Sequence, residues 1–156
     1  MNNLEEQQGI IDALFSELDA LSPPDLGKRI SRFVDEQPHL MGFMFNLDDD
    51  FSEESHNYLL KSAIVIRDVL VGAGIPLKVV DNQVIEQIVD DRVDRYDSLS
   101  GIEAKVEDYM TLSSSPQMLE AVVKHAKSND ENLILIIDVI ISVLEESAAD
   151  QKERSK

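Results

Sequence analysis

Apolar residues recur along this chain at the three- and four-residue spacing of an α-helix. The first stretch, residues 3–21, places Ile11, Phe15 and Leu18 on one face, and later stretches repeat the pattern. No stretch alternates apolar and polar residues over the length of a strand, and no Asn-Gly or Asp-Gly hairpin dipeptide occurs. The pattern therefore predicts an all-α protein.

Capping residues, prolines and glycines divide the chain into about eight helical segments. The signals are Ser22-Pro23, Pro38, Ser52, the Gly72 and Gly74 pair, Asp81, Ser100-x-x-Glu103, Ser115-Pro116, and Asn129 or Asp130. The links between segments are short, as in arrays whose neighbouring helices pack antiparallel. We predict a single-domain helical bundle or array of about seven to eight helices at residues 1–149, followed by a flexible tail at residues 150–156.

Residues 75–80 fit two interpretations. Pro76 and the run Leu77-Lys78-Val79-Val80 suit a short extended segment before Asp81 caps the next helix. The same apolar run also suits a helical turn. The sequence leaves both open.

The predicted helix at residues 38–47 is apolar nearly all round. Its residues include Leu40, Met41, Phe43, Met44 and Phe45. A helix of this kind must be buried or covered by a partner. We expect a buried position, with Phe43 contributing to a binding interface or to self-association.

Composition adds an unusual charge to this picture. The sequence has 14 Lys and Arg against 31 Asp and Glu, a formal net charge of −17 that is spread along the whole chain. The electrostatic field of such a charge repels nucleic acid and anionic lipid, and it speeds encounter with a basic protein. It also fits a protein that is simply kept soluble by its charge.

Cysteine is absent, which excludes disulfides and thiolate metal sites. The N-terminus has neither a basic region nor an apolar run of the kind found in signal peptides, and the longest apolar stretch is too short to span a bilayer. We therefore expect a cytoplasmic protein.

An aspartate-rich cluster lies in the fifth predicted helix. Asp90-Asp91-Arg92-Val93-Asp94 has the form of the D-D-x-x-D element that all-helical prenyl-transferring enzymes use to hold magnesium. The resemblance is confined to these five residues, because no second aspartate-rich box and no Arg and Lys cluster for a diphosphate are found. Asp90, Asp91 and Asp94 are nevertheless the candidate ligands of a divalent cation.

The same helix also fits an acidic face turned to solvent or to a basic partner. The candidate partner-binding residues, besides Phe43, are Glu86, Asp90, Asp94 and Asp97. Asp91 and Arg95 lie one turn apart and are expected to pair. Like charges one turn apart repel by about 0.2–0.5 kcal/mol per pair. A bound cation or a basic partner would reduce the repulsion among these acidic side chains.

Other carboxylate patterns are weaker. Glu53-x-x-His56 matches half of a di-iron motif, but no second copy exists, and Asp48-x-Asp50-x-Ser52 begins a calcium loop that then lacks the required glycine and glutamate. Asp138 interrupts the apolar run of the last helix, either as a buried carboxylate or, as we expect, on one edge that faces water.

No nucleophile motif, phosphate-binding loop or histidine pair points to catalysis. The sequence favours a non-enzymatic module without cofactors that binds another protein, as an adaptor or as an inhibitor of a basic target. The alternative is a small helical enzyme with a carboxylate-bound divalent cation. Formation of a homo-oligomer is compatible with either.

Overall fold

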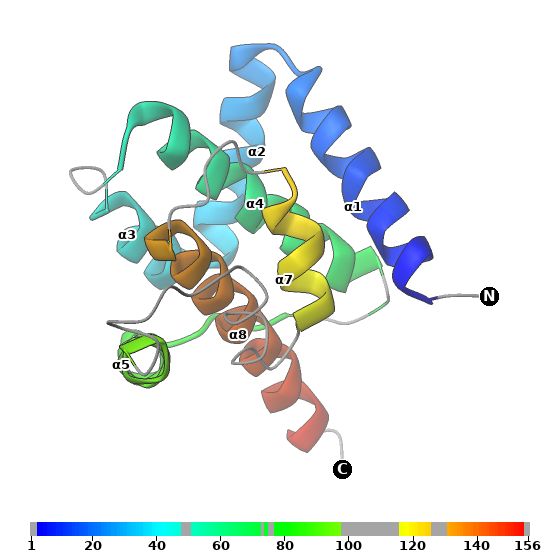
Figure 1. The fold of residues 1–156 in the computed structure, drawn as a ribbon. Coiled ribbons are helices and arrows are strands. Elements are labelled where there is room, and N and C mark those ends of the chain that lie inside the picture. The colour runs from blue at the N-terminus through cyan, green and yellow to red at the C-terminus, as the bar shows by residue number, and fades with distance from the viewer. Residues whose placement is uncertain are drawn as a thin grey trace.

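The computed structural model describes residues 3–47, 51–72, 74, 77–97, 116–125 and 131–154. Every regular element in those ranges is an α-helix, which confirms the all-α prediction (Figure 1). The helices are α1 (Asn3–Asp19), α2 (Pro23–Glu36), α3 (Pro38–Phe45), α4 (Glu53–Gly72), α5 (Asn82–Asp97), α7 (Pro116–Val123) and α8 (Glu131–Arg154). The helix predicted to begin at Ser100 lies outside the described residues. At the other end, α8 continues past Ala149, so residues 150–154 belong to a helix.

Several of the predicted start and stop signals act as expected, while Ser100, Ser115, Asn129 and Asp130 lie outside the described residues. Ser22 Oγ accepts a hydrogen bond from the backbone N–H of Asp25 at 3.3 Å, and Ser52 Oγ accepts one from Ser55 at 3.1 Å. Just after α4, Gly74 has φ +84°, a left-handed conformation that favours glycine. These local signals set the helix boundaries.

The core is built around α4 and α8, which lie against each other at the centre of the molecule (Figure 1). α1 and α7 pack together on this pair, α5 packs on α8, and α2 and α3 complete the array. Buried side chains of all the described helices form one apolar cluster. Full burial of each large aliphatic side chain is worth about 1.5–3 kcal/mol, which is why α8, whose residues 133–144 are apolar except for Asp138 and Ser142, occupies the centre.

The prediction that Asp138 lies on a water-facing edge of the last helix is wrong. The side chain of Asp138 is 0% exposed, and Arg92 of α5 covers it with Nε 3.7 Å from its Oδ2. The same guanidinium donates from Nη2 to Ser142 Oγ at 2.9 Å. Asp138 and Ser142 of α8 are therefore both contacted by an arginine on another helix, which the spacing along α8 cannot reveal.

The segment before α5 is neither helix nor strand at residues 77–80. Buried Gln37 donates to Lys78 O at 2.6 Å and accepts from the N–H of Val80 at 3.1 Å. The hydroxyl of Ser147 contacts both backbone groups of Lys78. The side chains of Gln37, between α2 and α3, and of Ser147 on α8 thus replace the backbone hydrogen bonds that this segment lacks.

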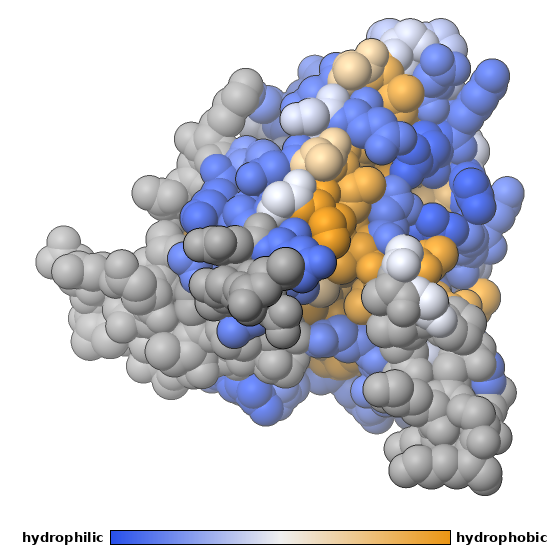
Figure 2. Space-filling view, turned by 90° about the vertical axis from the view of Figure 1, so that its right-hand side faces the viewer, coloured by the Kyte–Doolittle hydropathy of each residue, from blue (hydrophilic) through white to orange (hydrophobic). Residues whose placement is uncertain are grey.

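Hydrophilic side chains cover much of the described surface shown in Figure 2, with apolar side chains exposed in a strip between them. Among the described residues, no helix has both the length and the apolar character needed to cross a membrane.

Candidate functional site

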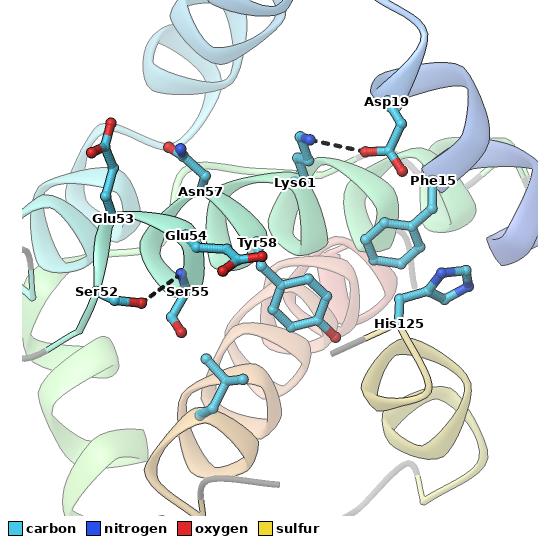
Figure 3. Close-up of a pocket in the computed structure, with 11 residues that line it drawn as sticks. Phe15, Asp19, Ser52, Glu53, Glu54, Ser55, Asn57, Tyr58, Lys61 and His125 are labelled. Atoms are coloured by element: carbon cyan, nitrogen blue, oxygen red, sulfur yellow. Dashed lines mark hydrogen bonds and ion pairs between the residues drawn. The ribbon is translucent and has the colours of Figure 1, made fainter. Parts of the chain in front are cut away.

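A pocket of about 1040 Å³ opens between α1, the first half of α4 and the chain that follows α7 (Figure 3). Its wall on α4 includes Glu53, Glu54, Tyr58 and Lys61, which follow the Ser52 cap. A volume of this size is typical of ligand sites. The pattern of apolar and polar residues along the chain does not predict this pocket.

An aromatic stack forms one side of the pocket. The ring of Phe15 lies between Tyr58 and His125, with centroid distances of 5.9 and 4.2 Å and interplanar angles of 13° and 20°. The hydroxyl of Tyr58 donates to Val122 O at the end of α7. Burial raises the pKa of the Tyr58 hydroxyl above its ordinary value, so this group keeps its proton well into the alkaline range.

His125 also contacts Asp12, which lies on α1 like Phe15. Its Nε2 lies 2.7 Å from Asp12 Oδ1, and Gln8 donates to the same oxygen at 2.7 Å. The hydrogen bond to His125, followed by that from Gln8, holds the pKa of the Asp12 carboxyl below its ordinary value. The rings are therefore fixed in place before any ligand binds.

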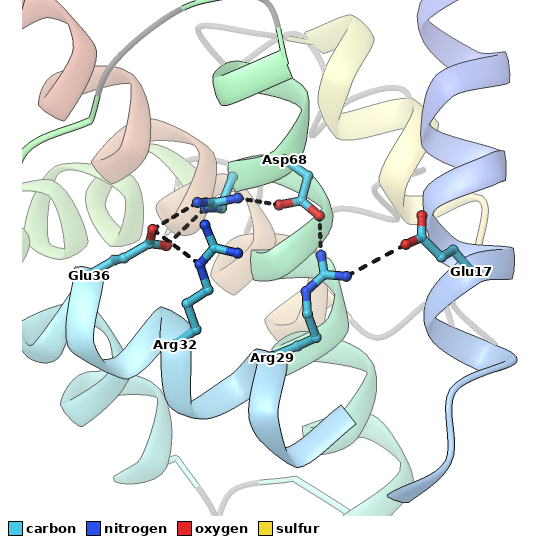
Figure 4. A network of polar contacts seen from close by, with 6 residues as sticks. Glu17, Arg29, Arg32, Glu36 and Asp68 are labelled. Atoms are coloured by element: carbon cyan, nitrogen blue, oxygen red, sulfur yellow. Dashed lines mark hydrogen bonds and ion pairs between the residues drawn. The ribbon is translucent and has the colours of Figure 1, made fainter. Parts of the chain in front are cut away.

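A network of ion pairs joins α2 to α4 on another side of the molecule (Figure 4). Arg67 donates to both carboxylate oxygens of Glu36, at 2.9 and 2.7 Å, and to Asp68 at 2.7 Å. Asp68 also pairs with Arg29, which lies 3.7 Å from Glu17 of α1. The Glu36 hydrogen bonds raise the pKa of Arg67 above its ordinary value.

Each arginine whose side chain the structure describes forms an ion pair within the chain. The cations found in intramolecular ion pairs are Arg29, Arg32, Lys61, Arg67, Arg92 and Arg95. Acidic residues outnumber Lys and Arg by 31 to 14, so these cations cannot pair with all of the carboxylates.

The outer face of α5 is where the predicted partner-binding carboxylates are found. Glu86, Asp90 and Asp94 are exposed, and none of the three forms an ion pair within the described part of the chain. Asp97 ends the helix, and the position of its side chain is not described. Ile85 and Arg92 are buried on the opposite side, against α8.

The predicted pair of Asp91 and Arg95 is confirmed. Arg95 Nε lies 3.1 Å from Asp91 Oδ2, and Arg92 Nη1 lies 3.5 Å from the same oxygen. Asp91 is therefore compensated, unlike Asp90 and Asp94 on either side of it.

Across the described ranges, no group of three or more His, Asp or Glu side chains is arranged to hold a metal ion. Asp90, Asp91 and Asp94 lie within those ranges, and their role as cation ligands stays a prediction. The ring of His56 is buried and its Nε2 lies 3.0 Å from Met44 O, so it contacts the end of α3. Asp48 and Asp50 lie outside the described residues.

The apolar helix α3 is buried on one side. Leu40, Met41 and Met44 belong to the core, while Phe43 is half-buried against it and Phe45 is 43% exposed. Burial of this helix was correctly expected, and binding of a partner at Phe43 stays a prediction.

No short motif identifies the pocket, because Phe15, Tyr58 and His125 belong to three distant parts of the sequence. Comparisons with protein-family models, curated proteins and solved structures give no match to this chain.

Proposed function

We propose that this protein binds a basic protein partner through the outer face of α5 and works as a non-enzymatic interaction module, either an adaptor or an inhibitor of that partner. One observation carries the proposal: Glu86, Asp90 and Asp94 face solvent without ion pairs in the described structure, whereas most described arginines are used inside the fold. The negative surface is thus left for an external cation.

The geometry of α5 suits this role. Glu86, Asp90 and Asp94 are spaced by four residues, so they follow one another along a single side of the helix. Their mutual repulsion, about 0.2–0.5 kcal/mol per pair, disappears when a basic surface docks. The buried contacts of Arg92 with Asp138 and Ser142 hold the helix in place on α8.

The charge also defines the class of partner. A net charge of −17 accelerates encounter with a basic protein and opposes binding of nucleic acid or anionic membranes. A cytoplasmic location is part of the proposal. The alternative function, a small helical enzyme with a carboxylate-bound divalent cation, has less support, since the described residues contain no group of three or more acidic or histidine side chains arranged for a metal ion.

Affinity capture with two charge-matched variants tests the proposal. The first variant combines Glu86→Gln, Asp90→Asn and Asp94→Asn on α5. The second spreads the same change over α2, α7 and α8, as Asp35→Asn, Glu120→Gln and Glu146→Gln, at exposed positions without ion pairs in the described structure. Both have the same net charge, so any difference between them reports on the α5 face.

We expect the wild type and the dispersed variant to recover the same basic protein, and the α5 variant to lose it. Equal recovery by all three proteins would contradict a role for α5. Thermal melting in magnesium is the check on the enzyme alternative: a ligand at a hundredfold excess over its Kd would add about 2.7 kcal/mol, and this gain should be absent.

A further inference from the structure

We propose that α5 is a strap, a helix that detaches from α8 as one unit while the other described helices stay folded. The detachment follows from the way α5 is attached to α8. Its consequence for partner binding rests on the function proposed for the outer face of α5.

The apolar attachment of α5 is small. Ile85 is its one buried apolar side chain within residues 82–95. By contrast, α4 and α8 bury apolar side chains along residues 59–70 and 133–144. α5 lies at the edge of the molecule, beside α8 (Figure 1). Elements with few buried apolar contacts are the first to open in a native protein.

The polar attachment of α5 depends on Arg92. Its guanidinium contacts Asp138 and Ser142 of α8. The remaining nitrogen, Nη1, is buried without a hydrogen bond in the described structure, and it lies 3.5 Å from Asp91 Oδ2. Removing a guanidinium from water costs free energy, and its contacts offset this cost only in part when one donor is unused. Arg92 therefore fixes the position of α5 more than it stabilises it.

α2 also has one buried apolar side chain, Phe33, but it is attached differently. Arg67 of α4 contacts both carboxylate oxygens of Glu36, and Arg29 of α2 pairs with Asp68 (Figure 4). These groups are partly exposed, so they keep part of their hydration and lose less free energy on pairing. We therefore expect α2 to remain on α4 when α5 is released.

The chain before α5 gives the strap a fixed end. Val80 is buried, and the side chain of Gln37 binds the backbone of Lys78 and Val80. The hydroxyl of Ser147 on α8 binds the backbone of Lys78 as well. Residues 77–80 are thus held by the rest of the fold, and release is expected to begin where α5 starts, at Asn82.

Once released, α5 should lose its helical structure. Its acidic residues at positions 86, 90 and 94 repel one another along one side. An isolated helix of 16 residues that is rich in valine and aspartate is barely stable in water. The backbone amides of α5 should then exchange with solvent together, and not one by one from the ends.

For the proposed function, release acts as a switch. The carboxylates of α5 follow one another along one side only while the helix is intact, so a partner that binds this face binds the docked form. Partner binding and release of α5 then oppose each other by thermodynamic linkage. Conditions that favour release would lower the apparent affinity without altering any contacting residue.

Native-state hydrogen exchange of the full chain, followed by NMR at low urea concentrations, tests the proposal. We expect the amides of residues 86–95 to share one opening free energy and one urea dependence. Their exchange, corrected for intrinsic rates, should be about a hundredfold or more faster than that of the slowest amides of α4 and α8, and less dependent on urea. Exchange of α5 at the rates of α4 and α8 would overturn the proposal, and so would amides of α5 that open without a shared urea dependence.

Two variants separate release of α5 from global unfolding. Arg67→Met weakens the α2–α4 network, which stays intact when α5 is released. It should therefore speed exchange in α4 and α8 by about fivefold or more and leave α5 within about twofold of the wild type. Arg92→Lys weakens the attachment itself, which is lost on release and on global unfolding alike. It should speed exchange in all three helices by about tenfold or more.

Lys28→Met, at an exposed position of α2, is the control and should leave all of these rates within about twofold of the wild type. Equal acceleration of α5 and α4 in Arg67→Met would overturn the proposal, because α5 would then open only with the whole molecule. That comparison decides the matter even where Arg92→Lys is too unstable to measure. Unchanged exchange of α5 in a folded Arg92→Lys variant would also overturn it, because the arginine would not be the attachment.

None of these measurements requires the partner. Equal capture by the α5 variant and the dispersed variant would reject the function proposed for the outer face and leave the exchange pattern of the strap unaffected. Failure of the exchange predictions would remove the strap and leave the capture result in place.

Discussion

The α2–α4 face and the α5 face use the same residue types in opposite ways. Between α2 and α4, Glu36 and Asp68 each contact an arginine, and the charges cancel within the fold (Figure 4). On α5, Arg92 turns inward to Asp138, and Asp90 and Asp94 remain outside. One face holds helices together, and the other offers uncompensated charge to solvent.

This difference shows that an acidic composition alone does not locate a binding surface. A carboxylate that is paired within the fold is neutralised for an approaching molecule, whereas an exposed one without an ion pair contributes its full field. In α5 both kinds of carboxylate occur within residues 90–94, because Arg92, the single arginine of this cluster, is buried and contacts the core.

The largest expected effect is on the buried side of α5. Arg92→Leu leaves Asp138 in the core without its guanidinium, and breaking a buried pair in this way costs about 3–5 kcal/mol of unfolding free energy. Urea denaturation measures the loss. The double variant with Asp138→Leu should recover most of it, and a double variant as unstable as the single one would show that the pair is not the cause.

The α2–α4 network should respond less. Arg67→Met removes the two-pronged contact with Glu36 and the contact with Asp68, but these groups are partly solvated, so we expect a loss of about 1–3 kcal/mol. Lys28→Met on the exposed side of α2 is the matched control and should change stability by less than about 0.5 kcal/mol. Similar values for both would remove the contrast between paired and exposed charge.

The half-exposed pair of Asp12 and His125 should have a smaller, pH-dependent effect. Because the pKa of Asp12 is lowered in the folded state, its contribution is present above the ordinary value of 3.8 and is lost as the pH falls through the folded pKa. Solvent screening limits it to about 0.2–1 kcal/mol. Denaturation curves below pH 4 should therefore show a gentler decline for Asp12→Asn than for the wild type, and identical slopes would contradict this assignment.

The smallest effect on stability is expected on the outer face of α5. Neutralising Glu86, Asp90 and Asp94 together removes only mutual repulsion, so the unfolding free energy should stay within about 0.5 kcal/mol of the wild type or rise slightly. Thermal melting checks this. A clear loss of stability would mean that these carboxylates have a structural role.

The helix boundaries were predictable because their causes are local. Ser22-Pro23, Ser52 and Gly74 act on backbone groups within a few residues, and their effects can be read from the sequence. The exposed face of α5 follows for the same reason, from the spacing of its acidic residues.

The surroundings of Asp138 and the aromatic pocket were not predictable in this way. Whether Asp138 faces water depends on Arg92, and the stack depends on Phe15 and His125 meeting Tyr58 across helices. Such contacts arise from helix packing, for which periodicity along one helix carries no signal.

The association rate constant with the captured basic partner tests the central claim most directly. It is to be measured for the wild type, the α5 triple variant and the dispersed triple variant over a range of salt concentrations. We predict that the α5 variant associates about tenfold or more slowly than the dispersed one at low salt, and that the difference shrinks as salt screens the charges. Equal rates for the two variants would contradict the account, because the outer face of α5 would then be no different from any other acidic surface of the molecule.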